Sequence, residues 1–139
     1  MYNRSWAHQG PQSMDAIKRF NANLKRFKDN DGIMIGYHGT SGSMGKVIEQ
    51  EGFKNYKSID GTVGVWFWED KFQSNAGMAG EKKAKELKED EYAVIKAELT
   101  KPDADFSPYA RPIWRAQKDK IKILGIEYVK VGEDPKYNF

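Results

Sequence analysis

Residues 33–54, IMIGYHGTSGSMGKVIEQEGFK, place a β-prone segment directly before a short amphipathic one, and this pairing decides the fold. The apolar and β-branched start predicts a strand over residues 33–39. Ser43 then predicts the N-cap of a short helix that ends at Gly52. One of only two histidines in the chain, His38, stands where the strand ends, which makes it the first candidate for a functional group.

Further helices and strands are predicted on both sides of this stretch. Two prolines and Trp114 predict an irregular segment over residues 103–119, with at most one helical turn. The other predicted elements are a helix over 13–28, a strand over 62–68, a helix over 70–89, a strand over 92–99 and one or two strands over 120–131, broken at Gly125. This order predicts an α+β fold with a mostly antiparallel sheet.

The length of 139 residues suits one domain. We expect an N-terminal arm over residues 1–12 and a single domain over residues 13–139. The chain has no cysteine, which excludes disulfides, thiolate metal sites and a cysteine nucleophile. His8 and His38 are far apart in sequence, so no metal site is expected.

The net charge of +3 favours anionic partners without choosing among nucleotides, RNA and acidic proteins. No apolar run approaches the length of a membrane span, and the polar N-terminal sequence lacks the apolar core of a signal peptide. We therefore expect a monomer without a membrane partner. It would act in the cytoplasm, or be delivered into a target cell without a cleaved signal peptide.

Three features on predicted strands combine groups that often serve in chemistry. They are His38-Gly39-Thr40, the aromatic run around Trp66, and Glu127 among apolar neighbours. On simple alternation Glu127 shares a face with Ile121 and Ile123, where it either meets water at a sheet edge or lines a cleft. Each group also has an ordinary structural explanation: a histidine satisfied by backbone, a core tryptophan and a solvated glutamate.

Taken in order, the blocks "GYHGT", "GVWFWED" and "IEYV" resemble the diphtheria-toxin and poly(ADP-ribose) polymerase branch of the ADP-ribosyltransferases. The likeness covers residues 33–131. It implies an ADP-ribosyltransferase-like fold: a mostly antiparallel split sheet with flanking short helices around an NAD cleft. NAD would be a co-substrate, no metal would be needed, and the chain would be toxin-like or an effector.

The resemblance also implies roles for particular residues. His38 would bind the adenosine ribose, the Gly39 backbone would hold the nicotinamide carboxamide, and Trp66 would stack on the nicotinamide ring. Glu127 would stabilise the positive charge that develops on the ribose as nicotinamide leaves. The remaining NAD-binding residues would be Tyr37, Thr40, Phe67, Phe72, Ser74 and Met78.

Two positions depart from the family pattern. Where a second stacking aromatic is expected, the chain reads "SNAGMAG", so Met78 or Phe72 would form the second wall. Two residues before Glu127 stands Gly125, where arginine-modifying relatives carry a glutamate. This argues against an arginine acceptor.

Three hypotheses follow. The first is a mono-ADP-ribosyltransferase that moves ADP-ribose from NAD to a protein, nucleic acid or small-molecule acceptor and releases nicotinamide, with residues 103–118 as the acceptor-facing segment. The second is a degenerate module that binds NAD or ADP-ribose without chemistry, since the second aromatic is missing. The third is a small nucleic-acid-binding domain that uses the basic helix over residues 13–28.

Overall fold

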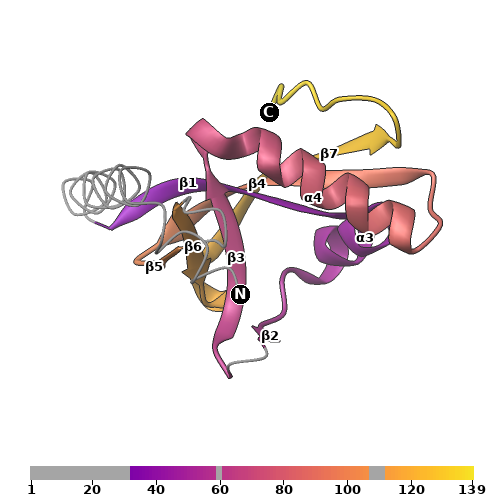
Figure 1. Cartoon of the computed structure of the whole chain (residues 1–139). Coiled ribbons are helices and arrows are strands. Elements are labelled where there is room, and N and C mark those ends of the chain that lie inside the picture. The colour runs from indigo at the N-terminus through magenta and orange to yellow at the C-terminus, as the bar shows by residue number, and fades with distance from the viewer. Residues whose placement is uncertain (1–31, 59–60, 107–111) are drawn as a thin grey trace, which may run out of the picture.

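The computed structural model describes residues 32–58, 61–106 and 112–139, and the structural statements below concern these residues. Figure 1 shows the elements along the chain. The strands are β1 (Ile33–Ser41), β2 (Tyr56–Lys57), β3 (Val63–Glu69), β4 (Glu91–Thr100), β5 (Asp103–Phe106), β6 (Pro112–Ala116) and β7 (Ile121–Lys130). The helices are α3 (Gly42–Glu51) and α4 (Gln73–Glu86), with 3-10 turns at Asp70–Phe72 and Lys118–Lys120. The expected arm (1–12) and the expected helix over 13–28 lie outside the described residues.

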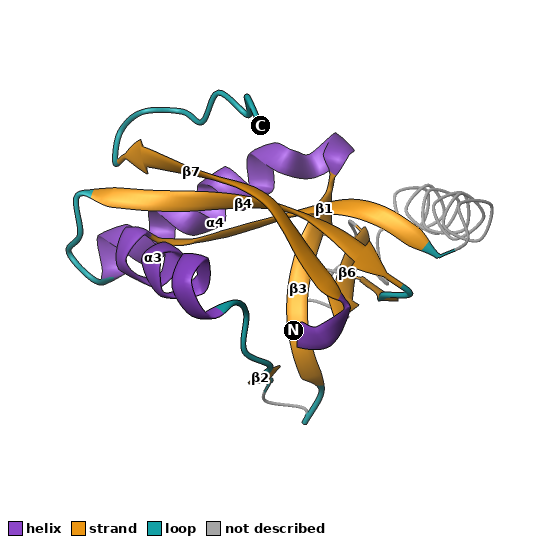
Figure 2. Ribbon diagram, turned by 180° about the vertical axis from the view of Figure 1, so that it is seen from behind, coloured by secondary structure: helices purple, strands orange, loops and turns teal. Residues whose placement is uncertain are grey.

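All seven strands belong to one sheet, in the order β5-β6-β3-β1-β4-β7, with β2 paired to β3 beside this path. Every strand pair is antiparallel. Figure 2 shows the long strands crossing the molecule between the two helices. The predicted α+β class with a mostly antiparallel sheet is confirmed.

The two helices pack on opposite faces of the sheet. A Cβ added to Gly45 of α3 would lie 2.6 Å from the Ala93 side chain. A Cβ added to Gly80 of α4 would lie 3.1 Å from backbone atoms of Thr40 and Ala93, on the other side of the sheet. We call these two sides the α3 face and the α4 face.

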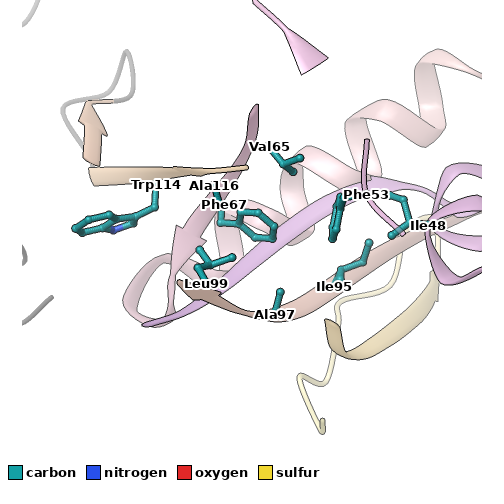
Figure 3. Packing of buried hydrophobic residues seen from close by; sticks show 9 residues of the cluster. All are labelled: Ile48, Phe53, Val65, Phe67, Ile95, Ala97, Leu99, Trp114 and Ala116. Atoms are coloured by element: carbon teal, nitrogen blue, oxygen red, sulfur yellow. The ribbon is translucent and has the colours of Figure 1, made fainter. Parts of the chain in front are cut away.

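Each face carries its own apolar core, because successive side chains on a strand point to opposite sides. Figure 3 shows the α3-face core, in which Phe67 and Phe53 lie near one another. Its buried members are Ile48, Phe53, Val65, Phe67, Ile95, Ala97, Leu99, Trp114 and Ala116. The α4-face core consists of Tyr37, Ala76, Ala84, Tyr92, Val94 and Val129.

Helix α3 begins two residues earlier than predicted. Its N-cap is Ser41, whose hydroxyl accepts a hydrogen bond from the Met44 amide at 3.2 Å. Ser43, the predicted cap, instead donates its amide and its hydroxyl to the Glu89 carboxylate, at 2.9 and 2.6 Å. The prediction of Gly52 as the end of the helix is confirmed.

The segment expected to be irregular contains two strands. β5 and β6 pair with each other, and β6 continues the ladder of β3, with Phe67 opposite Trp114. The Trp114 indole is buried and donates a hydrogen bond to the Glu69 carboxylate at 3.0 Å. Prolines are compatible with strands at a sheet edge or at a strand's first residue, and Pro112 begins β6.

Strand β7 runs unbroken through Gly125 but contains a bulge one residue earlier. Gly125 lies opposite Lys96 and Ile123 opposite Ala97, so Leu124 is an extra residue without a partner of its own. The extra residue reverses the alternation. Odd-numbered side chains lie on the α3 face before Leu124, and even-numbered side chains lie on that face after it.

Candidate functional site

Strands β1 and β3 separate at His38. They pair only at Gly36–Glu69 and Tyr37–Trp68, whereas β1 pairs with β4 along its whole length to Ser41. Farther along β3, the short strand β2 pairs with it at Gly64. The described strands therefore form a fork, and the section of β3 inside it carries no strand pairing on this edge.

The His38 ring spans this fork. Its Nδ1 lies 2.8 Å from the carbonyl oxygen of Trp66 on β3. A carbonyl only accepts hydrogen bonds, so Nδ1 carries the proton and donates it. The ring also contacts Phe53 at 5.3 Å and Phe67 at 5.6 Å between centroids, and these two rings hold its orientation.

Burial also determines the charge of His38. Desolvation lowers the pKa of His38 below its ordinary value of 6.5, and the opposing hydrogen bond to the Trp66 carbonyl does not offset it. At neutral pH the ring is uncharged, and its Nε2 presents a lone pair rather than a proton. His38 as a whole residue is intermediate in exposure, and Nε2 is the ring atom left to accept a hydrogen bond if a ligand hydroxyl reaches it.

Gly39 serves the packing of α4. A Cβ at this position would lie 1.7 Å from the Ala76 carbonyl oxygen and 2.7 Å from the Gly80 amide. The expected open approach to the Gly39 backbone on this side is thus occupied by α4 itself. Thr40 is buried beside it, 7% exposed, so its side chain also serves the interior.

The aromatic residues of β3 divide between the two faces. Phe67 is fully buried in the α3-face core, where its ring contacts the His38 ring. Trp66 is half-buried and points to the other side, where it lies opposite Arg115. Trp66 therefore contributes its carbonyl to the fork and its indole to the α4 face.

Tyr37 lies in the α4-face core, 4% exposed. Its hydroxyl donates to the Asp70 carboxylate at 2.8 Å. Burial and Asp70 together raise the pKa of Tyr37 to about 12. A role for the Tyr37 side chain in binding NAD at the fork is not supported, because the side chain points away from His38.

The other expected binding residues lie before or on α4. Phe72 is half-buried in the 3-10 turn and Ser74 is exposed in the first turn of the helix. Met78 is 69% exposed and lines, together with Trp68, an open hollow of about 570 Å³ on α4. Trp66 does not line this hollow, so Met78 does not complete a ring site with Trp66.

Glu127 lies on the opposite face from His38. Cross-strand partners share a face, and the rows are His38–Ile95–Ile126 and Gly39–Val94–Glu127. The Glu127 carboxylate accepts hydrogen bonds from the amides of Lys136 and Tyr137, both at 2.8 Å. Glu127 therefore holds the C-terminal segment.

The bulge explains this placement. Simple alternation puts Glu127 on the face of Ile121 and Ile123, but the extra residue Leu124 moves it to the other face. β1 and β4 also separate β7 from β3, a distance of about 14 Å at the usual strand spacing. The expected convergence of His38, Trp66 and Glu127 around one dinucleotide does not occur.

No group of three or more histidine, aspartate or glutamate side chains in the described part of the chain could hold a metal ion. None of the helices described here has both the length and the apolar character that crossing a membrane requires.

The comparisons with known proteins identify no relative. The chain matches no protein-family model, no curated protein and no solved structure at a significant level.

Sequence reasoning missed two contacts, one beside His38 and one on the α4 face. Phe53 packs on His38, and the Tyr137 hydroxyl donates to the Gln73 carbonyl at 2.8 Å beside α4. The glycine before Phe53 marks a helix end but does not indicate which face the ring will fill. Tyr137 follows a proline and lysine in a segment without periodicity, so no sequence signal places it against Tyr37.

Proposed function

We propose that this chain binds an adenine nucleotide with a second ribose, NAD or ADP-ribose, at the fork between β1 and β3, without transferring ADP-ribose. The observation that carries the proposal is His38 itself. A neutral imidazole with a fixed tautomer offers one acceptor atom, Nε2, at the place where two strands part.

A ribose hydroxyl is the natural partner of such an acceptor. The Nδ1 proton is committed to the Trp66 carbonyl, so Nε2 has only its lone pair to offer and selects a donor. A phosphate oxygen accepts hydrogen bonds and is not a donor at neutral pH. The resemblance of "GYHGT" to the ADP-ribosyltransferase histidine block names NAD as the first dinucleotide to test.

The position of Glu127 supports the second part of the proposal, binding without transfer. Cleavage of the nicotinamide bond needs a fixed negative charge beside the ribose as positive charge develops there. Glu127 is on the other face of the sheet, and the pKa of His38 is set by burial and the Trp66 carbonyl rather than by a carboxylate. The expected transfer to a protein, nucleic-acid or small-molecule acceptor is therefore not part of the proposal.

Titration calorimetry with NAD and ADP-ribose tests the binding. In His38→Asn the amide nitrogen can still donate to the Trp66 carbonyl, but the acceptor at Nε2 is lost. We expect this variant to weaken binding about tenfold, the effect of one hydrogen bond. An analogue of NAD that lacks the adenosine-ribose hydroxyl should bind the native chain and the variant equally weakly. The hydrogen bond to Nε2 cannot form in either complex, because the analogue has no hydroxyl to donate.

Two results would contradict the proposal. Equal affinity of NAD for the native chain and His38→Asn would remove His38 from the site. Release of nicotinamide by the native chain, assayed in the same samples by mass spectrometry, would show that the chain cleaves the nicotinamide bond and does more than bind.

A further inference from the structure

The outer edge of β7 is the longest free strand edge among the described residues. β7 is the last strand of the sheet, ten residues long, and pairs only with β4. The C-terminal segment reaches it through the Glu127 carboxylate and through Phe139 packed near Gly125, without adding a strand. A free edge of this length can pair with another strand.

The bulge gives this edge a self-complementary pattern. Ile121, Ile123, Ile126 and Tyr128 lie opposite odd-numbered residues of β4, so these four share one backbone orientation and the α3 face. Lys122, Gly125 and Glu127 lie opposite even-numbered residues and share the other. An antiparallel pairing requires partners of the same orientation.

We propose that two copies of this chain pair antiparallel through β7, with Ile123 opposite Ile126 of the second copy and Lys122 opposite Glu127. In a strand without the bulge these partners would have opposite orientations, and this register would be impossible. With the extra residue Leu124, the pairs Ile121–Tyr128, Lys122–Glu127 and Ile123–Ile126 agree in both orientation and face.

The side chains in this register suit one another. On the α3 face the pairs are apolar, Ile123 with Ile126 and Ile121 with Tyr128. On the α4 face Lys122 meets Glu127, an opposite-charge pair of the kind that stabilises neighbouring strands. At the centre, Leu124, 43% exposed, lies opposite Gly125 of the second copy, whose α4-face side is already covered by Phe139 of its own chain.

A small hollow beside this centre adds room for the contact. It has a volume of about 290 Å³ and is lined by Glu49, Ile123, Leu124, Gly125, Ile126 and Tyr128. In the proposed dimer the hollow of each copy lies beside the axis, next to the exposed Leu124 of the other copy. The competing explanation is that the bulge and Lys122 protect the edge from pairing, as such features do in many sheets.

Sedimentation of the full chain over a concentration series decides between them. The proposal predicts a monomer–dimer equilibrium. Leu124→Glu, an exposed position in the monomer, should raise the dimer dissociation constant by at least about tenfold, because the two new charges approach each other across the axis. Leu87→Glu, at an equally exposed apolar residue after α4, should leave it unchanged.

Disulfide trapping tests the register, since the native chain has no cysteine. Chains with Ile123→Cys and Ile126→Cys, mixed and oxidised, should form the mixed disulfide in excess over either homodimer. Like residues would be about 8 Å apart, beyond disulfide reach. A native chain that stays monomeric at its solubility limit, or trapping without preference for the mixed pair, would overturn the proposal.

Discussion

A single hydrogen bond determines what the His38 side chain can do. The Trp66 carbonyl takes the Nδ1 proton, and burial keeps the ring neutral. A histidine at the end of an exposed strand would change tautomer and charge with its surroundings. Here the ring keeps one acceptor atom available over the physiological pH range, which suits recognition of a hydroxyl group.

The lowered pKa of His38 predicts a pH dependence of stability. In the unfolded chain the imidazole takes up a proton near pH 6.5, whereas the folded protein resists protonation until a lower pH. The free energy of unfolding should therefore fall as the pH drops below 6.5 and level off once the folded ring is protonated. Thermal melts over a pH series measure this.

The His38→Asn variant supplies the control for this pH series. It keeps a donor for the Trp66 carbonyl but cannot titrate, so the part of the slope that belongs to His38 should disappear. Identical slopes in the native chain and the variant would show that the ring is as easily protonated in the folded protein as in the unfolded chain.

At the scale of elements, helix α4 and strand β1 approach one another through glycines. Gly39 faces the Ala76 carbonyl, and Gly80 faces the Thr40 backbone. The helix can lie this close only because neither position carries a Cβ. The contact holds β1 in place next to His38, with α4 on the α4 face and the His38 ring on the α3 face.

Gly39→Ala should therefore be among the most destabilising single substitutions in the chain. The added carbon would lie 1.7 Å from the Ala76 carbonyl oxygen, and a backbone atom cannot move aside as a side chain can. We expect a loss of at least about 3 kcal/mol in the free energy of unfolding, measured by denaturant titration.

Gly61→Ala is the matched control. Gly61 has a positive φ of 88° but open space around it, so only backbone strain of about 1 kcal/mol applies. Equal losses in the two variants would mean that α4 does not lie against β1 as closely as the structure has it.

Local patterns predicted some elements well and others poorly. The strand at His38, the end of α3 at Gly52 and the antiparallel sheet follow from β-propensity, a C-terminal glycine and element order. β5 and β6 were missed because the prolines suggested a break, while the pairing of β6 with β3 is a long-range effect. The face of Glu127 was predicted wrongly because a bulge leaves no mark in the sequence that differs from an ordinary leucine and glycine.

At the scale of the whole molecule, the C-terminal segment contacts strands β1, β4 and β7 on the α4 face. Glu127 receives the amides of Lys136 and Tyr137, while the Tyr92 hydroxyl donates to the Glu133 carbonyl. The Tyr137 ring meets Tyr37 edge to face, at 6.0 Å between centroids. The segment completes the α4-face core.

Glu127→Gln should separate this structural role from a catalytic one. Glutamine keeps one oxygen, so one amide hydrogen bond survives without its charge, whereas its NH2 group faces the other amide and that bond is lost. We expect the free energy of unfolding to fall by about 1–3 kcal/mol. NAD affinity should not change, because the fork lies on the other face. Calorimetry on the folded variant checks this, and a variant as stable as the native chain but weakened in NAD binding would place Glu127 at the ligand.

¹⁵N spectra of the histidine rings test most directly whether a nucleotide hydroxyl meets Nε2 of His38. In the free protein, His38 should show the neutral form protonated at Nδ1, with His8 as the internal reference. Saturation with ADP-ribose should shift the His38 Nε2 resonance and leave its tautomer unchanged. A His38 spectrum unaffected by ADP-ribose and NAD at saturating concentration would contradict the account.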